Sequence, residues 1–169
     1  MKREIGRRML RLKELKSLPS NIAIDTGPLL LPITREPGWS KIRKLLRMHE
    51  EGEVLLHIGL FNISELVYAM LRLGYDMKTS LRYAALIYER LKVIKNSQYA
   101  TWMGKLRAKA YELNYSIPWG DISSAAVAVY MNIPVLALDK DKHFDKLSTI
   151  CRKLNKQIQI IHVGEITAT

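Results

Sequence analysis

IAIDTGPLLL, residues 22–31, is the stretch of sequence that decides the fold, because it is an apolar run interrupted by a single acid. The β-branched and small residues 22–24 predict a short buried strand, and Gly27 and Pro28 predict a turn that leads into a helix. Asp25 therefore falls at the carboxyl end of a strand, the edge of an open α/β sheet at which ligands and reacting groups gather. The local alternative is an aspartate whose side chain accepts hydrogen bonds from backbone N–H groups of the turn.

Strands and helices alternate along the rest of the chain. Apolar runs predict further strands at residues 54–58, 135–138 and 158–163. Helical spacing predicts helices at residues 40–50, 79–95, 98–114 and 122–131, and further helices that begin near Asn62 and Phe144. The apolar face of the helix after Asp121 consists of small side chains, which would let this helix lie close against a sheet. This order predicts an α/β/α sandwich with a central, mostly parallel sheet and right-handed crossovers.

Several polar residues have local explanations at the predicted helix starts. Ser40 can cap the helix that runs toward Glu50. Asn62 and Glu65 fit the two positions of a capping box, with Asn62 as the N-cap and Glu65 as the third helical residue. Asp121 fits an N-cap, a position at which aspartate is among the favoured residues. Each residue therefore has a structural role available before a functional one is considered.

The composition is that of a globular protein with a basic surface. The 169 residues include 27 Lys and Arg against 16 Asp and Glu, a net charge of +11 that attracts polyanions such as nucleic acids. The length predicts a single domain whose core needs no disulfide or metal. The single cysteine, Cys151, excludes an internal disulfide, and no run approaches the roughly 18 apolar residues of a membrane span. We therefore expect a cytoplasmic protein without a membrane segment.

Residues 1–20 form a basic segment ahead of the main domain, which we place at residues 21–169. Arginines and lysines surround Ile5, Met9 and Leu12, whose spacing predicts an amphipathic helix with a basic face. Such a helix can contact nucleic acid or a partner helix, or it can be a solvated helix packed by its apolar stripe. The sequence leaves both interpretations open.

The predicted elements give several acids corresponding positions. Asp25 follows the first strand, and either Asp139 or Asp141 follows a later one. Glu65 and Asp121 fall in the first turns of helices. Carboxylates gathered at one sheet edge repel and raise one another's pKa unless a cation lies among them. Hard divalent ions take carboxylate and phosphate oxygens, and a basic surface around such a site suits cleavage of a phosphodiester backbone.

The sequence blocks around these acids resemble those of PIN domains, the ribonuclease fold of prokaryotic VapC-type toxins and of several RNA-processing nucleases. The resemblance runs from about residue 21 to 165, and its blocks are Asp25-Thr26, Ile63-Ser64-Glu65-Leu66, Asp121-Ile122-x-x-Ala125 and Leu136-x-x-Asp139-x-Asp141-x-x-Phe144. The resemblance implies a compact domain that binds Mg²⁺ or Mn²⁺ and cleaves single-stranded RNA with a metal-activated water. It also implies metal-coordinating roles for Asp25, Glu65 and Asp121, with Thr26 as a catalytic helper beside the first.

The sequence departs from this family pattern in two places. The last block usually reads Thr or Ser, any residue, then Asp; Ala137-Leu138-Asp139 lacks the hydroxyl, whereas Asp139-Lys140-Asp141 replaces it with an acid. We place Asp139 slightly ahead of Asp141 as the fourth metal-binding acid and keep both as catalytic candidates. VapC-type toxins usually begin near the first strand, so the extension at residues 1–20 leaves a toxin role open.

These observations lead to the hypothesis of a metal-dependent endoribonuclease whose acids hold Mg²⁺ or Mn²⁺ and whose basic residues hold RNA. The alternative is a PIN-fold module that binds RNA or a ribonucleoprotein without cutting it. The resemblance makes an antitoxin protein a candidate partner and a homodimer the expected assembly. The triplet Asp25-Thr26-Gly27 also occurs in aspartic proteases, but their all-β fold disagrees with the predicted helices. A receiver domain has an acidic pair near its start that this chain lacks.

The remaining polar and aromatic residues carry weaker signals. The histidines are scattered without a metal-binding spacing, and His143, which falls nearest the acids, is a candidate for substrate contact. Lys140 and Lys142 can meet phosphate or solvate a loop. Tyrosines and tryptophans of the predicted helices fall on helical stripes, which favours packing over a base-stacking platform.

Overall fold

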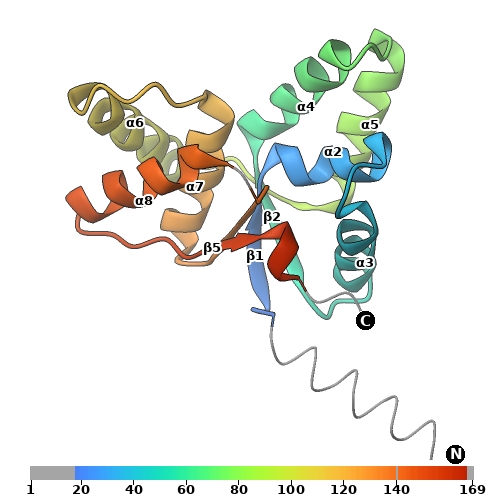
Figure 1. The fold of residues 1–169 in the computed structure, drawn as a ribbon, viewed down its shortest axis with the longest axis horizontal. Helices are drawn as coiled ribbons and strands as arrows, with labels where there is room; N and C mark the ends of the chain where they lie inside the picture. Colours follow the sequence, from blue (N-terminus) through green and yellow to red (C-terminus); the bar gives the residue numbers. More distant parts are fainter. Residues whose placement is uncertain (1–17, 140, 167–169) are drawn as a thin grey trace, which may run out of the picture.

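The computed structural model describes residues 18–139 and 141–166 of the chain (Figure 1). Most of the basic segment 1–20, for which an amphipathic helix is predicted, lies outside the described residues, and so does Lys140. Among the described residues, no helix is both long and apolar enough to cross a lipid bilayer.

A parallel sheet with the strand order β3-β2-β1-β4-β5 forms the centre of the fold. Its strands are β1 (Asn21–Ile24), β2 (Leu55–Gly59), β3 (Lys92–Ile94), β4 (Val135–Ala137) and β5 (Ile160–His162). The helices are α2 (Thr26–Thr34), α3 (Trp39–Glu50), α4 (Leu60–Arg72), α5 (Met77–Arg90), α6 (Ser97–Glu112), α7 (Trp119–Met131) and α8 (Lys142–Lys153), and a 3₁₀ turn, η1 (Val163–Glu165), follows β5.

The strand order has a switch point between β1 and β4. From β1 the chain moves outward to β2 and β3, and it then returns to the other side of β1 to form β4 and β5. In open α/β sheets, ligands bind in the crevice beyond the carboxyl ends of the strands at such a point. Asp25 directly follows β1, so the topology places it beside this crevice.

Alternate residues of the strands pack into two separate cores. Ile22 and Ile24 of β1 pack with residues of α2, α3, α4 and α5, whereas Ala23 between them packs with residues of α6, α7 and α8. Figure 1 shows the same division, with α6, α7 and α8 on one side of the sheet and the other helices on the opposite side. The predicted α/β/α sandwich with a parallel central sheet is therefore confirmed.

Helix α7 is buried along most of its length, since every residue from Gly120 to Val129 is buried. It contacts β1, β2 and β4. The small side chains Ala125 and Ala126 permit this close approach, as the sequence predicts. As a result, the first turn of α7 lies against the carboxyl edge of the sheet.

The end of one predicted helix and the cap of another are wrong. The helix predicted at residues 79–95 ends at Arg90, because Leu91 has extended backbone angles (φ −90°, ψ 163°) and leads into β3. β3 is a short edge strand of exposed and half-buried residues, so it lacks the alternating pattern that reveals a strand. Ser40 is not the cap of α3. The cap is Gly38, whose φ of 97° lies in the left-handed region that favours glycine.

Candidate metal centre

Asp25 lies at the junction of β1 and α2, where it both caps the helix and faces the crevice. Its Oδ2 atom accepts a hydrogen bond from the backbone N–H of Gly27 at 3.3 Å, as the local interpretation requires. Its Oδ1 atom accepts one from the Ser124 hydroxyl at 2.7 Å. Burial raises the pKa of Asp25 to about 6; the hydrogen bond from Ser124 opposes this rise, and the charge of Glu65 adds to it. Asp25 therefore caps α2 and also lies within reach of the charge of Glu65.

Glu65 does not have the capping role that its spacing from Asn62 predicts. Helix α4 begins at Leu60 with Gly59 at the N-cap, so the predicted capping box is wrong. The reason is that β2 passes directly into the helix without a polar cap. The Oε2 atom of Glu65 instead accepts a hydrogen bond from the Thr26 hydroxyl. Thr26 thereby orients the Glu65 carboxylate toward the end of β1.

Asn62 is fully buried and ties α4 to two other helices. Its side-chain nitrogen lies 3.0 Å from the Thr26 hydroxyl, 3.1 Å from the Gly120 carbonyl oxygen and 3.0 Å from the Ser124 hydroxyl. Its side-chain oxygen accepts a hydrogen bond from Ser123. The sequence treats Asn62 only as a cap, because no spacing in a single chain marks contacts with residues so distant along it. Asn62 is therefore a positioning residue that sequence reasoning missed.

Asp121 is the third residue of α7 and not its N-cap, so that local prediction is also wrong. The N-cap is Pro118, whose backbone (φ −58°, ψ 149°) starts the helix earlier than predicted. Beside Asp121, the Glu65 carboxylate lies directly against Gly120. A Cβ atom on Gly120 would lie 1.9 Å from Glu65 Oε2 and 2.0 Å from Oε1. Glycine at this position therefore lets Glu65 reach the first turn of α7.

The charge state of Asp121 reflects this crowding. The residue is 8% exposed, and burial raises its pKa to about 8, with further contributions from the charges of Asp25, Asp141 and Glu65. Its Oδ2 atom is buried and makes no hydrogen bond. A buried carboxylate oxygen without a hydrogen bond, among other carboxylates, is a position that favours a cation.

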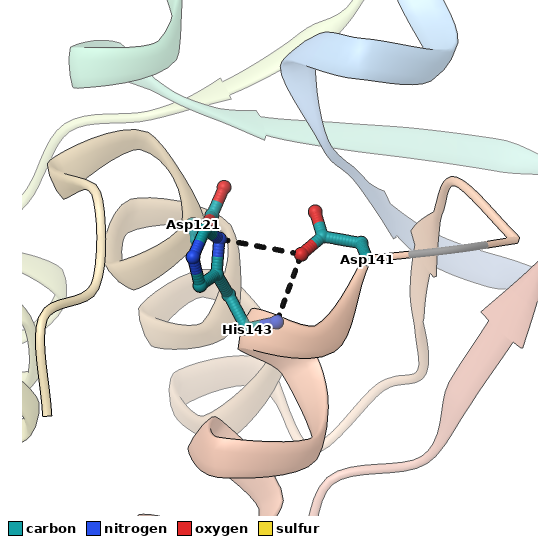
Figure 2. Close-up of side chains that lie close together, drawn as sticks. All are labelled: Asp121, Asp141 and His143. Atoms are coloured by element: carbon teal, nitrogen blue, oxygen red, sulfur yellow. Dashed lines mark hydrogen bonds and ion pairs between the residues drawn. The ribbon is translucent and has the colours of Figure 1, made fainter.

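The structure separates the two candidates for the fourth acid. Asp141 caps α8 by accepting a hydrogen bond from the backbone N–H of His143 at 3.0 Å, and its charge acts on Asp121 (Figure 2). The exposed Asp139 instead accepts a hydrogen bond from the backbone N–H of Gly164, beyond β5, at 2.6 Å. The structure therefore brings Asp141 to the other acids, although the sequence placed Asp139 slightly ahead.

Asp121 and Asp141 each have a carboxylate oxygen within 4.8 Å of the other and of the His143 ring, and the charges of Asp25 and Glu65 also act on Asp121, so this donor set suits a divalent cation. The four acids come from the end of β1, from α4, from α7 and from the cap of α8, and their side chains supply the hard oxygen atoms that Mg²⁺ and Mn²⁺ take. Within residues 18–139 and 141–166, the ion pairs of these acids come from the imidazole of His143 alone. A metal ion would add positive charge to this single imidazole.

The other histidines make structural contacts. The ring nitrogens of His49 lie 3.1 and 2.9 Å from backbone carbonyl oxygens, and one ring nitrogen of His162 lies 3.0 Å from another. His57 lies 2.9 Å from the side-chain oxygen of Asn21. These contacts tie the three histidines to neighbouring protein atoms and leave His143 as the histidine at the acids.

The sequence model of the PIN domain family matches residues 22–149, a range that includes all of the acids discussed above. Among curated proteins, no sequence matches the chain.

Several crystal structures share the fold at low sequence identity. DNA-bound VapBC from Salmonella typhimurium gives a TM-score of 0.64 at 18% identity, covering 86% of this chain and 99% of that chain. VapBC2 from Rickettsia felis, bound to a DNA fragment from their promoter, gives 0.62 at 14% identity, with 84% and 98% covered. VapBC-5 from Mycobacterium tuberculosis, a member of the VapBC family of toxin-antitoxin systems, gives 0.51 at 16% identity, with 85% and 99% covered.

Substitution of Gly120 tests whether the Glu65 carboxylate must lie against α7. We expect Gly120→Ala to fold but to bind Mn²⁺ at least about tenfold more weakly by titration calorimetry, because its Cβ atom would displace Glu65. Gly104→Ala in α6 is the matched control, since a Cβ atom there meets no atom within 4 Å. Unchanged Mn²⁺ affinity in Gly120→Ala would contradict this arrangement.

Asp121 should make the metal-free protein less stable as the pH rises. Its pKa is about 8 in the folded protein against an ordinary value of 3.8, so the folded state binds the proton more tightly and loses this advantage as the pH rises through 8. We expect the melting temperature without metal to fall between about pH 5 and pH 9. Asp121→Asn should flatten this dependence and melt a few degrees higher at the upper end, where ~1 kcal/mol shifts Tm by ~2–4 °C.

Thermal melts with Mn²⁺ complete the same test. Metal binding favours the ionised carboxylate, so Mn²⁺ should restore the stability of the unmodified protein at high pH and leave Asp121→Asn unaffected. Asp139→Asn is the control and should keep the original pH dependence, because Asp139 contacts Gly164 instead of the acids. Equal pH dependence in both variants would refute the assignment of Asp121.

Proposed function

The chain belongs to the PIN domain family, and we propose that it is a metal-dependent endoribonuclease that hydrolyses phosphodiester bonds of RNA. The observation that carries the proposal is the buried Oδ2 atom of Asp121, which makes no hydrogen bond and faces the charges of Asp25, Glu65 and Asp141. Neighbouring carboxylates repel one another unless a cation lies among them. We propose that these four acids hold Mg²⁺ or Mn²⁺.

The protein's own side chains would keep the acids in place for this chemistry. When bound, the ion supplies an activated water and neutralises charge that develops on the phosphate. The Thr26 hydroxyl donates to Glu65, and the Ser124 hydroxyl donates to Asp25, so both carboxylates present fixed oxygen atoms to the ion. Asn62 spans Thr26 and Ser124 and keeps the two hydroxyls at a constant separation. In this proposal Thr26 acts by positioning Glu65.

RNA as the substrate is supported by charge and by aromatic side chains beside the acids. The net charge of +11 attracts a polyanion. Phe61 lies one helical turn before Glu65 on the same face of α4, and its ring centroid lies 6.1 Å from that of Trp119. The guanidinium of Arg107 lies 5.0 Å from the centre of the Trp119 ring. Exposed aromatic rings with a cation beside them suit the stacking of unpaired bases.

We also propose protein partners for this chain. The VapBC structures of similar fold include a member of a toxin-antitoxin family, and an antitoxin-type protein is the partner that this likeness suggests. Exposed apolar side chains on and between α4 and α5 support a protein contact there, either with such a partner or in a homodimer; they are Tyr68, Leu73, Met77, Leu81 and Leu86.

Cleavage of a labelled single-stranded RNA tests the nuclease proposal. We expect cleavage with Mn²⁺ or Mg²⁺, none with EDTA, and a loss of at least about a hundredfold in Asp121→Asn and Asp141→Asn, since each removes a metal-binding charge. Asp139→Asn is the matched control and should keep most of the activity. If the unmodified protein and Asp121→Asn bind RNA equally and neither cuts it, the chain is a module that binds RNA or a ribonucleoprotein.

Removal of the aromatic rings tests how the RNA is bound. In the Asp121→Asn background, which prevents cleavage, Phe61→Ala and Trp119→Ala should each weaken binding of single-stranded RNA by about 5- to 100-fold, as expected for loss of base stacking. Tyr111→Ala on α6 is the control, because Tyr111 is also an exposed aromatic residue (84%). Fluorescence anisotropy would measure the affinities, and equal losses in all three variants would argue against stacking at this site.

A further inference from the structure

His143 contacts two of the acids, although the proposed nuclease chemistry gives it no role. It is the second residue of α8, and its Nδ1 atom lies 2.8 Å from Asp121 Oδ2 and 3.4 Å from Asp141 Oδ1. Figure 2 shows the three side chains together, with the imidazole ring beside Asp121 and the Asp141 carboxylate opposite. The backbone of His143 is held as well, since its N–H donates to Asp141. One nitrogen of the ring is therefore fixed between two carboxylates.

The contact with Asp121 is close, yet it is not a hydrogen bond. Although Nδ1 lies 2.8 Å away, the Oδ2 atom of Asp121 remains buried without a hydrogen-bond partner. An imidazole that served only as the counter-charge of Asp121 would point its N–H along a lone pair of this oxygen. The contact is therefore an ion-pair distance without hydrogen-bond alignment, and the separations of the donor atoms bear on whether they share an ion.

The distances fit a shared ion. One ligand atom from each of Asp121, Asp141 and His143 lies within 4.8 Å of the others. Adjacent ligands of an octahedral ion with bonds of about 2.1 Å lie about 3 Å apart, and opposite ligands about 4.2 Å apart. Nδ1 lies 2.8 Å from Asp121 Oδ2 and 3.4 Å from Asp141 Oδ1. These two distances lie just below and just above the separation expected for adjacent ligands. Nδ1 can therefore join the two carboxylate oxygens around one ion with small movements.

We propose that His143 binds the divalent ion directly through Nδ1, together with Asp121 and Asp141, and that the site consequently prefers Mn²⁺ to Mg²⁺. Mg²⁺ favours oxygen ligands, whereas imidazole nitrogen suits transition-metal ions. This inference rests on the metal site of the proposed function and adds a nitrogen ligand to it. The site would be a mixed oxygen and nitrogen site, in which the histidine sets the metal preference.

Pulsed electron paramagnetic resonance of the full chain loaded with Mn²⁺ tests the ligand directly. A coordinated imidazole gives nitrogen modulations in the Mn²⁺ signal, and we expect them in the unmodified protein and not in His143→Gln. His162→Gln is the matched control and should keep them, because its Nδ1 lies against the carbonyl oxygen of Leu138. Labelling with ¹⁵N-histidine should change the modulation pattern. Modulations that persist in His143→Gln would overturn the proposal.

Metal affinity separates a ligand from a counter-charge. If His143 is a ligand, His143→Gln should weaken Mn²⁺ binding at least about tenfold and change Mg²⁺ binding much less, as measured by titration calorimetry. If His143 only pairs with Asp121, its removal frees the carboxylate, and the affinity for both ions should stay the same or rise, which would overturn the proposal.

The outcomes also distinguish this proposal from the nuclease proposal. Cleavage of RNA by a protein that binds Mn²⁺ without nitrogen modulations would refute the role of His143 and leave the nuclease intact. Nitrogen modulations in a protein that cuts no RNA would support His143 as a ligand and count against the nuclease. A chain that binds neither ion would exclude both.

Discussion

The crowding of buried carboxylates at one end of the sheet is the constraint on which the rest of the structure depends. Burial and the charges of three neighbouring acids raise the pKa of Asp121 to about 8. The repulsion between carboxylates is much weaker at the protein surface, where water and salt screen like charges. The fold tolerates this repulsion because separate elements, each held by packing, position the four acids Asp25, Glu65, Asp121 and Asp141. A divalent cation among the acids would neutralise this repulsion, because each carboxylate would be attracted to the cation.

Small residues allow these elements to converge. Gly120 leaves room for the Glu65 carboxylate, and Gly59 leaves room for the buried contact between Tyr99 and Ser123, since a Cβ atom there would lie 2.5 Å from the Tyr99 hydroxyl oxygen and 2.4 Å from the Ser123 hydroxyl oxygen. The first turns of α4 and α7 can therefore touch, and Asn62 joins them through its amide. The parallel strands direct these helix starts to the same edge of the sheet. The two glycines let the helix starts approach each other closely.

The sequence predicts the sheet and the approximate position of the acids, because both follow from local patterns. Asp25 stands where a β-branched run ends, and an acid there must lie at the carboxyl edge of a parallel sheet. The choice between Asp139 and Asp141 depends on the path of a short turn and on the backbone N–H of Gly164, which no local pattern encodes. Asn62 contacts residues distant along the chain, so a single sequence marks it only as a candidate cap. His143 stands two residues from Asp141, and this proximity singles it out in the sequence.

Anomalous diffraction from crystals of the full chain grown with Mn²⁺ would test the metal centre most directly. We expect an anomalous peak within bonding distance of Asp121 Oδ2, with carboxylate oxygens of neighbouring acids around it. Crystals of Asp121→Asn should lack the peak. A structure at the same Mn²⁺ concentration with no peak, and with the acids paired through shared protons, would contradict it.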